Sequence, residues 1–111
     1  MTLEEYFQQS GSTDRYQQSA NGPNYWGPSL ELAGETGEAI EQVKKLYRDD
    51  KGVLSEERKA KIRSELGDVL WALSSVTRAC DLTLDDIARD NLAKIARRLA
   101  NNTIHGEGSA R

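Results

Sequence analysis

The stretch Ile62-Arg-Ser-Glu-Leu-Gly-Asp-Val-Leu-Trp-Ala-Leu73 carries the pattern that decides the fold of this chain. Its apolar residues recur every three or four positions, which is the spacing of one face of an α-helix. Residues 29–52 show the same spacing, and a short connection around Gly52 links the two segments. We therefore expect an antiparallel hairpin of two helices. The expected apolar stripes are Leu32, Thr36, Ala39, Ile40, Val43, Leu46 and Tyr47, and then Ile62, Leu66, Val69, Leu70, Leu73, Val76 and Cys80.

Small polar residues followed by acids mark where the helices should begin. Thr2 and Glu5 can form a capping box. Residues 11–28 are rich in Gly, Ser, Asn, Gln and Pro, so we expect mostly loop, with one helical turn around 14–18. The expected helices are a short one opening at Thr2, then Ser29 to Gly52, Ser55 to Cys80 and Thr83 to Ala100. No strand pattern competes, so the predicted fold class is all-α, with a tail at 101–111.

The composition limits the classes of protein to consider. With 111 residues the chain is expected to form a single domain over 1–111, and its 37% hydrophobic content and mean hydropathy of −0.71 suggest that oligomerisation completes the core. A net charge of −3 gives no general attraction to nucleic acid or to an anionic membrane. The lone Cys80 excludes an intramolecular disulfide, and no signal-peptide core or membrane-length run is found. We expect a soluble, cytoplasmic protein.

Two similar acidic motifs, Glu35-Thr-Gly-Glu38 and Glu65-Leu-Gly-Asp68, are the main candidates for a functional site. Acids three residues apart project from one side of a helix. Viewed down each helix, both pairs lie on the same side of the apolar stripe. When two helices pack antiparallel through these stripes, such sides fall together, so the two pairs should meet. Four neighbouring carboxylates are costly unless a cation neutralises them. We therefore expect a divalent-metal site, and its oxygen-only ligands favour Mg²⁺, with Mn²⁺ as a substitute.

The last expected helix carries Asn91, Lys94 and Arg98 along one edge. An amide and two cations beside a metal site would suit a phosphate-bearing ligand. Taken alone, the same residues could form an ordinary polar face. Trp71 lies opposite its helix's apolar stripe, which suggests a subunit interface or a base-stacking platform, whereas Cys80 lies on the stripe and is expected in the core.

The segments Leu32–Ala39, Glu65–Trp71 and Asn91–Arg98 together closely resemble the MazG-like all-α nucleoside triphosphate pyrophosphohydrolases, whose hallmark is ExxE followed by ExxD. Tyr6, Thr13 and the closing Ile104-His-Gly106 also resemble the short, single-domain branch of bacteria and phages. The resemblance implies hydrolysis of a nucleoside triphosphate between its α- and β-phosphates. It also implies a homodimer or a homotetramer built as a dimer of dimers.

Carried over by position, the resemblance implies Mg²⁺ ligation by Glu35, Glu38, Glu65 and Asp68, and nucleotide contacts from Asn91, Lys94 and Arg98. Glu38 is the favoured group for orienting or deprotonating the water, with Glu35 and Glu65 left open. Glu31 departs from the family pattern, where a small residue is usual, and could join the metal shell or be solvated. The base remains open, with dGTP or GTP as one possibility. The alternative function is a non-catalytic helical dimer that binds nucleotides or proteins.

Overall fold

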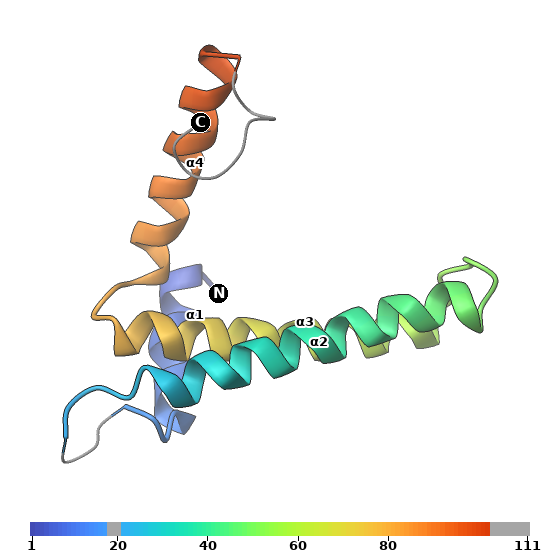
Figure 1. Cartoon of the computed structure of the whole chain (residues 1–111), viewed down its shortest axis with the longest axis horizontal. Coiled ribbons are helices and arrows are strands. Elements are labelled where there is room, and N and C mark those ends of the chain that lie inside the picture. Colours follow the sequence, from blue (N-terminus) through green and yellow to red (C-terminus); the bar gives the residue numbers. More distant parts are fainter. Residues whose placement is uncertain (18–20, 103–111) are drawn as a thin grey trace.

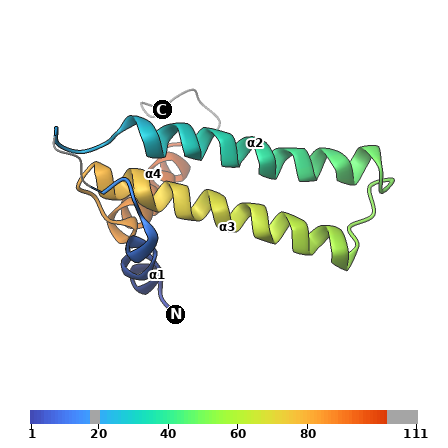
Figure 2. The ribbon, with the colours of Figure 1, turned by 90° about the horizontal axis from the view of Figure 1, so that it is seen from below.

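Two long helices packed side by side, α2 (Trp26–Arg48) and α3 (Glu56–Ala79), form the body of the protein (Figures 1 and 2). The computed structural model describes residues 1–17 and 21–102. The remaining elements are α1 (Leu3–Ser10), the short 3₁₀ helix η1 (Gly11–Thr13) and α4 (Leu84–Ala100). All the regular elements of these described residues are helices, and α2 runs antiparallel to α3, so the all-α prediction and the predicted hairpin are confirmed.

The ends of α2 differ from the sequence expectation at both sides. The helix begins at Trp26, before Pro28, because a proline is tolerated in a first turn, where its missing N–H would have no partner within the helix. It ends at Arg48, and the chain reverses through Lys51 and Gly52, with φ of 56° and 76°. The Gly52 amide donates to the Leu46 carbonyl at 3.0 Å, which closes the turn.

The other helix starts agree with the sequence. Ser55 Oγ accepts from the Arg58 amide at 3.1 Å, and Thr83 Oγ1 accepts from the Asp86 amide at 3.2 Å. Thr2 and Glu5 form the expected capping box. The helical turn expected around 14–18 occurs earlier, as η1, and residue 18 lies outside the described residues, as does most of the tail.

The apolar core is small, because α3 covers only part of the stripe on α2. Ala39 is buried between the helices, while Ile40 and Tyr47 on the same stripe are 62% and 71% exposed. Much of the buried surface of α3 is polar, with Ser74, Ser75 and Thr77 packed beside Ala72. The prediction that Cys80 is a core residue is wrong: as the C-cap of α3 it lies at the helix end and is exposed.

The amino-terminal segment is held across the end of α3 by Arg78. Its Nε donates to Asp14 Oδ2 at 3.0 Å, and its Nη1 donates to the Phe7 carbonyl at 3.1 Å. The guanidinium also lies over the Phe7 ring, 4.9 Å from the ring centroid. Because the Asp14 side chain is only 1% exposed, this ion pair is a buried tertiary contact.

Helix α4 leads away from the hairpin and packs against α1 (Figure 1). Its outer surface is apolar in part, since Leu92 and Leu99 are 68% and 67% exposed. Among the described residues, no helix combines the length and apolar character needed to cross a membrane.

Candidate metal centre

Three carboxylates from the two long helices meet near the middle of the hairpin. Glu35 and Glu38 project from α2 one turn apart, and Glu65 projects from α3. One oxygen from each lies within 4.8 Å of the other two. Because like flanks of antiparallel helices fall on the same side, the spacing of the two motifs produces this arrangement directly.

The electrostatics of this cluster favour a cation. Burial raises the pKa of Glu35, and the negative charges of Glu38 and Asp68 raise it further. Burial likewise raises the pKa of Glu65, again with contributions from Glu38 and Asp68. Glu35 Oε2 is buried without a hydrogen-bond partner among the described residues. An oxygen-only cluster whose charged form is disfavoured, with one unsatisfied oxygen, fits a hard divalent ion such as Mg²⁺.

Asp68, the fourth expected ligand, lies beside the cluster, outside the group of three. It is exposed, and its charge acts on both Glu35 and Glu65. The glycines of the motifs have no steric explanation within the described chain, because a Cβ added at Gly37 or Gly67 would meet no atom within 4 Å.

A cavity of about 310 Å³ adjoins the acidic cluster on the side toward the start of α2. Trp71 lines it, and the indole Nε1 donates to Thr13 Oγ1 at 2.9 Å, which fixes the ring against the amino-terminal segment. Glu35, a member of the acidic cluster, and Asp68, which lies beside the cluster, both line the cavity. The cavity is lined by Thr13, Glu31, Glu35, Asp68 and Trp71.

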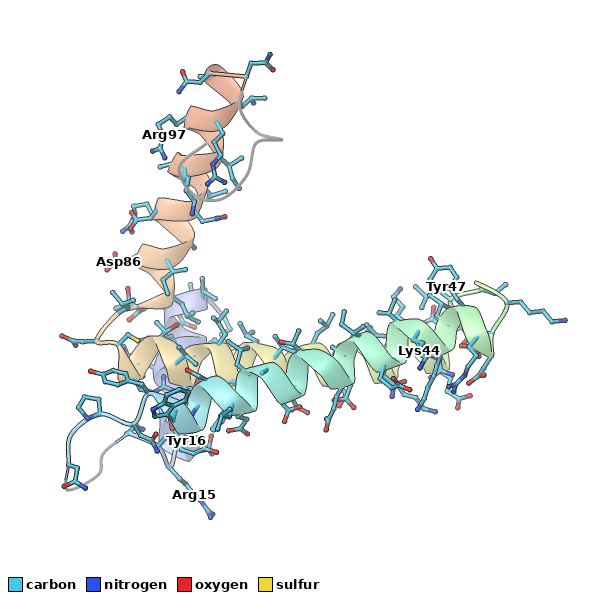
Figure 3. All side chains as sticks on the ribbon, viewed as in Figure 1. Arg15, Tyr16, Lys44, Tyr47, Asp86 and Arg97 are labelled. Carbon is cyan, nitrogen blue, oxygen red and sulfur yellow. The ribbon has the colours of Figure 1, made fainter. Side chains whose placement is uncertain are left out.

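Tyr16 lies beside Glu31, which lines this cavity. Tyr16 was not identified from the sequence, because its position depends on the path of a loop. The Glu31 carboxylate beside its hydroxyl raises the pKa of Tyr16. Its amide donates to Asp14 Oδ1 at 2.9 Å. The ring lies so close to Gly27 that a Cβ there would be 2.7 Å from two ring carbons. Figure 3 shows Tyr16 beside the start of α2, with Arg15 directed away from it.

The expected phosphate-contacting residues lie on α4. Asn91 is exposed, Lys94 is half-buried and Arg98 is buried. Helix α4 packs against α1 and leads away from the hairpin, so it does not lie along the acidic cluster of its own chain (Figure 1).

Comparisons with known proteins agree on this part of the chain. Residues 29–102 match the family described as MazG nucleotide pyrophosphohydrolase domain. The Gene 37 protein of Mycobacterium phage L5 is 35% identical over 83 residues, which cover 75% of this chain and 73% of that protein. No solved structure matches the chain. The family match includes the acidic motifs and α4, and leaves out residues 1–28, which supply Thr13 to the cavity and Tyr16 to the contact with Glu31.

Proposed function

Because the chain belongs to the MazG nucleotide pyrophosphohydrolase family, we propose that it hydrolyses a nucleoside triphosphate to the monophosphate and pyrophosphate in a Mg²⁺-dependent reaction. Water is added across the bond between the α- and β-phosphates, and both products leave as phosphate anions. The observation that carries this proposal is the cluster of Glu35, Glu38 and Glu65, whose oxygens lie within 4.8 Å of one another.

In the proposed mechanism Glu35, Glu38 and Glu65 hold the metal, and Asp68 completes the acidic wall beside them. When bound, Mg²⁺ neutralises phosphate charge and lowers the pKa of a coordinated water. Glu38 is the exposed member of the three, so a water molecule can reach its free side. We assign Glu38 the role of orienting that water and accepting its proton.

The phosphate-contacting residues of α4 would act in an oligomer. Apolar side chains on α2 and α4 are left uncovered by the single chain, among them Ile40, Tyr47, Leu92 and Leu99. A homodimer or a dimer of dimers would cover them. Asn91 and Lys94 of one copy would then reach phosphates bound at the acidic cluster of another, where positive charge stabilises the leaving pyrophosphate.

Product analysis with a panel of nucleoside and deoxynucleoside triphosphates tests the reaction. We expect monophosphate and pyrophosphate in Mg²⁺, and none in EDTA. Glu38→Gln should lower kcat by about a hundredfold or more, because a positioned base contributes that much. Glu41→Gln is the matched control, since Glu41 lies on the same helix and pairs only loosely with Lys44, at 3.9 Å.

The control should retain wild-type rates. If folded wild-type protein turns over none of the nucleotides, the proposed function is wrong, and the chain would be a nucleotide- or protein-binding module.

A further inference from the structure

The cavity beside the acidic cluster lies where the nucleoside part of a substrate would extend. Glu31 precedes Glu35 by four residues on α2, which is about one turn, or about 6 Å along the helix axis. The cavity extends from Glu35 and Asp68 to Glu31 and the amino-terminal segment. A triphosphate held at the acidic cluster could therefore place its sugar and base in this cavity.

The Glu31 carboxylate presents an acceptor inside this cavity. Glu31 Oε2 is buried, with no hydrogen-bond partner among the described residues. Glu31 is not one of the three acids whose oxygens cluster. The Tyr16 hydroxyl lies beside this carboxylate, and the Tyr16 ring packs against Gly27. A buried carboxylate oxygen without a hydrogen-bond partner favours a ligand that donates N–H groups.

We propose that this cavity is the nucleobase subsite and that Glu31 selects guanine by accepting hydrogen bonds from its N1–H and exocyclic N2 amino group. This inference rests on the proposed function. Guanine presents two adjacent N–H donors on its Watson–Crick edge, which match a carboxylate. Adenine and cytosine place one amino group beside a ring nitrogen that is an acceptor, and thymine places its single N–H between two carbonyls. A carboxylate repels the ring nitrogen in the first two bases and the carbonyl oxygens in the third.

The other walls of the cavity suit a flat aromatic ligand. The Trp71 indole lines the cavity, with its N–H fixed on Thr13 Oγ1. A ring held by its edge cannot swing away, so it offers a preformed surface for stacking a base. The volume of about 310 Å³ is at the lower end of small-molecule pockets.

Tyr16 acts as a positioning residue for Glu31. Asp14 holds the Tyr16 amide through Oδ1 and is itself held by Arg78 through Oδ2. Gly27 leaves the space that the Tyr16 ring occupies. The acceptor in the cavity is thus connected through Tyr16 and Asp14 to the end of α3.

The test compares kcat/KM for dGTP, dITP, dATP, dCTP and dTTP between wild type and Glu31→Gln, with Glu41→Gln as control. dITP lacks only the N2 amino group, so wild type should prefer dGTP over dITP by about tenfold, the worth of one charge-assisted hydrogen bond. Glu31→Gln should lower kcat/KM for dGTP about tenfold or more and reduce the preference over dITP. Its activity on dTTP should rise or stay the same, because the repulsion between the carboxylate and the thymine carbonyls is removed.

A binding measurement separates this proposal from the reaction itself. Calorimetric titration with dGMP in EDTA should show weaker binding to Glu31→Gln than to wild type, even if no nucleotide is hydrolysed. If hydrolysis occurs with the same base ranking in wild type and variant, the subsite assignment is wrong and the proposed function stands. Equal loss of all substrates together with lost Mn²⁺ binding would instead make Glu31 a metal ligand, and would also overturn the assignment.

Tyr16→Phe tests the positioning role without removing the carboxylate. We expect KM for dGTP to rise about threefold, with kcat for dTTP and Mn²⁺ affinity unchanged. An unchanged dGTP to dITP ratio in this variant would overturn the role of Tyr16.

Discussion

The carboxylates Glu35, Glu38 and Glu65 repel one another at neutral pH, and this repulsion fixes the direction in which the stability of the fold changes with pH. The pKa values of Glu35 and Glu65 are raised in the folded protein, so the native state binds protons more tightly than the unfolded chain. Stability from these groups is fully present below their unfolded pKa and is lost as pH rises through the folded values. Metal-free protein should therefore become less stable as pH rises from about 4 toward neutrality through these groups.

Replacing one of the repelling groups should remove part of this penalty. In EDTA at pH 7, Glu35→Gln should raise Tm by a few degrees, while in saturating Mg²⁺ the order should reverse, because wild type gains binding energy that the variant lacks. Thermal melts across pH 4 to 8, with and without Mg²⁺, measure both effects. A lower Tm for the variant in EDTA would show that Glu35 contributes structural contacts that outweigh repulsion.

For individual residues, the convergence of the acids could be predicted from the sequence, whereas the contact between Tyr16 and Glu31 beside them could not. Glu35, Glu38 and Glu65 could be brought together from helical spacing and the antiparallel connection alone. The contact between Tyr16 and Glu31 could not, because it joins a loop to a helix and depends on the space left at Gly27. Glu31 was visible only as a departure from a family pattern, with no indication of its partner.

Among the elements, the docking of the amino-terminal segment on α3 depends most on one ion pair. Arg78→Met should destabilise the protein by about 3 kcal/mol, because it leaves the Asp14 carboxylate buried without its cation. Arg89→Met is the control: Arg89 pairs with Asp86 at the surface, so about 0.5 kcal/mol or less is expected.

Urea denaturation measures both variants. Arg78→Met should also weaken the preference for dGTP, since Asp14 holds Tyr16. Equal stability of the two variants would show that α1 and η1 are held by other contacts.

The elements themselves could be predicted closely. The capping residues Thr2, Ser55 and Thr83 gave three helix starts correctly, because a side-chain oxygen that accepts from an amide three residues later is a local interaction. The start of α2 was misplaced by a few residues because Pro28 is compatible with a first turn as well as with a preceding loop.

For the whole molecule, the uncovered apolar surface predicts association. Ile40 is 62% exposed on α2, on the surface that α3 leaves open, whereas Val53 is 67% exposed in the hairpin turn. Ile40→Asp should shift a dimer or tetramer toward monomer in sedimentation velocity and lower kcat/KM, because Lys94 of α4 would no longer reach the site. Val53→Asp should change neither property. A wild-type monomer at about 100 µM would contradict this prediction.

The arrangement of α4 could not be predicted from its sequence. The edge formed by Asn91, Lys94 and Arg98 was expected beside the acids, and helical periodicity does locate those residues on one helix. Periodicity gives no direction for the helix axis, which is set by the turn at Asp81, with φ of 57°, and by packing against α1.

The chain of contacts from Arg78 through Asp14 and Tyr16 to Glu31 has a consequence for how such a protein can diversify. The family match begins at residue 29, and Asp14 and Tyr16 lie before it. In the proposed subsite, Glu31 lies in the same stretch as the acids for bond cleavage, whereas Asp14 and Tyr16, which position Glu31, are encoded before that stretch. Substitutions in the early stretch can change which nucleotide pool is drained while the reaction itself is inherited intact.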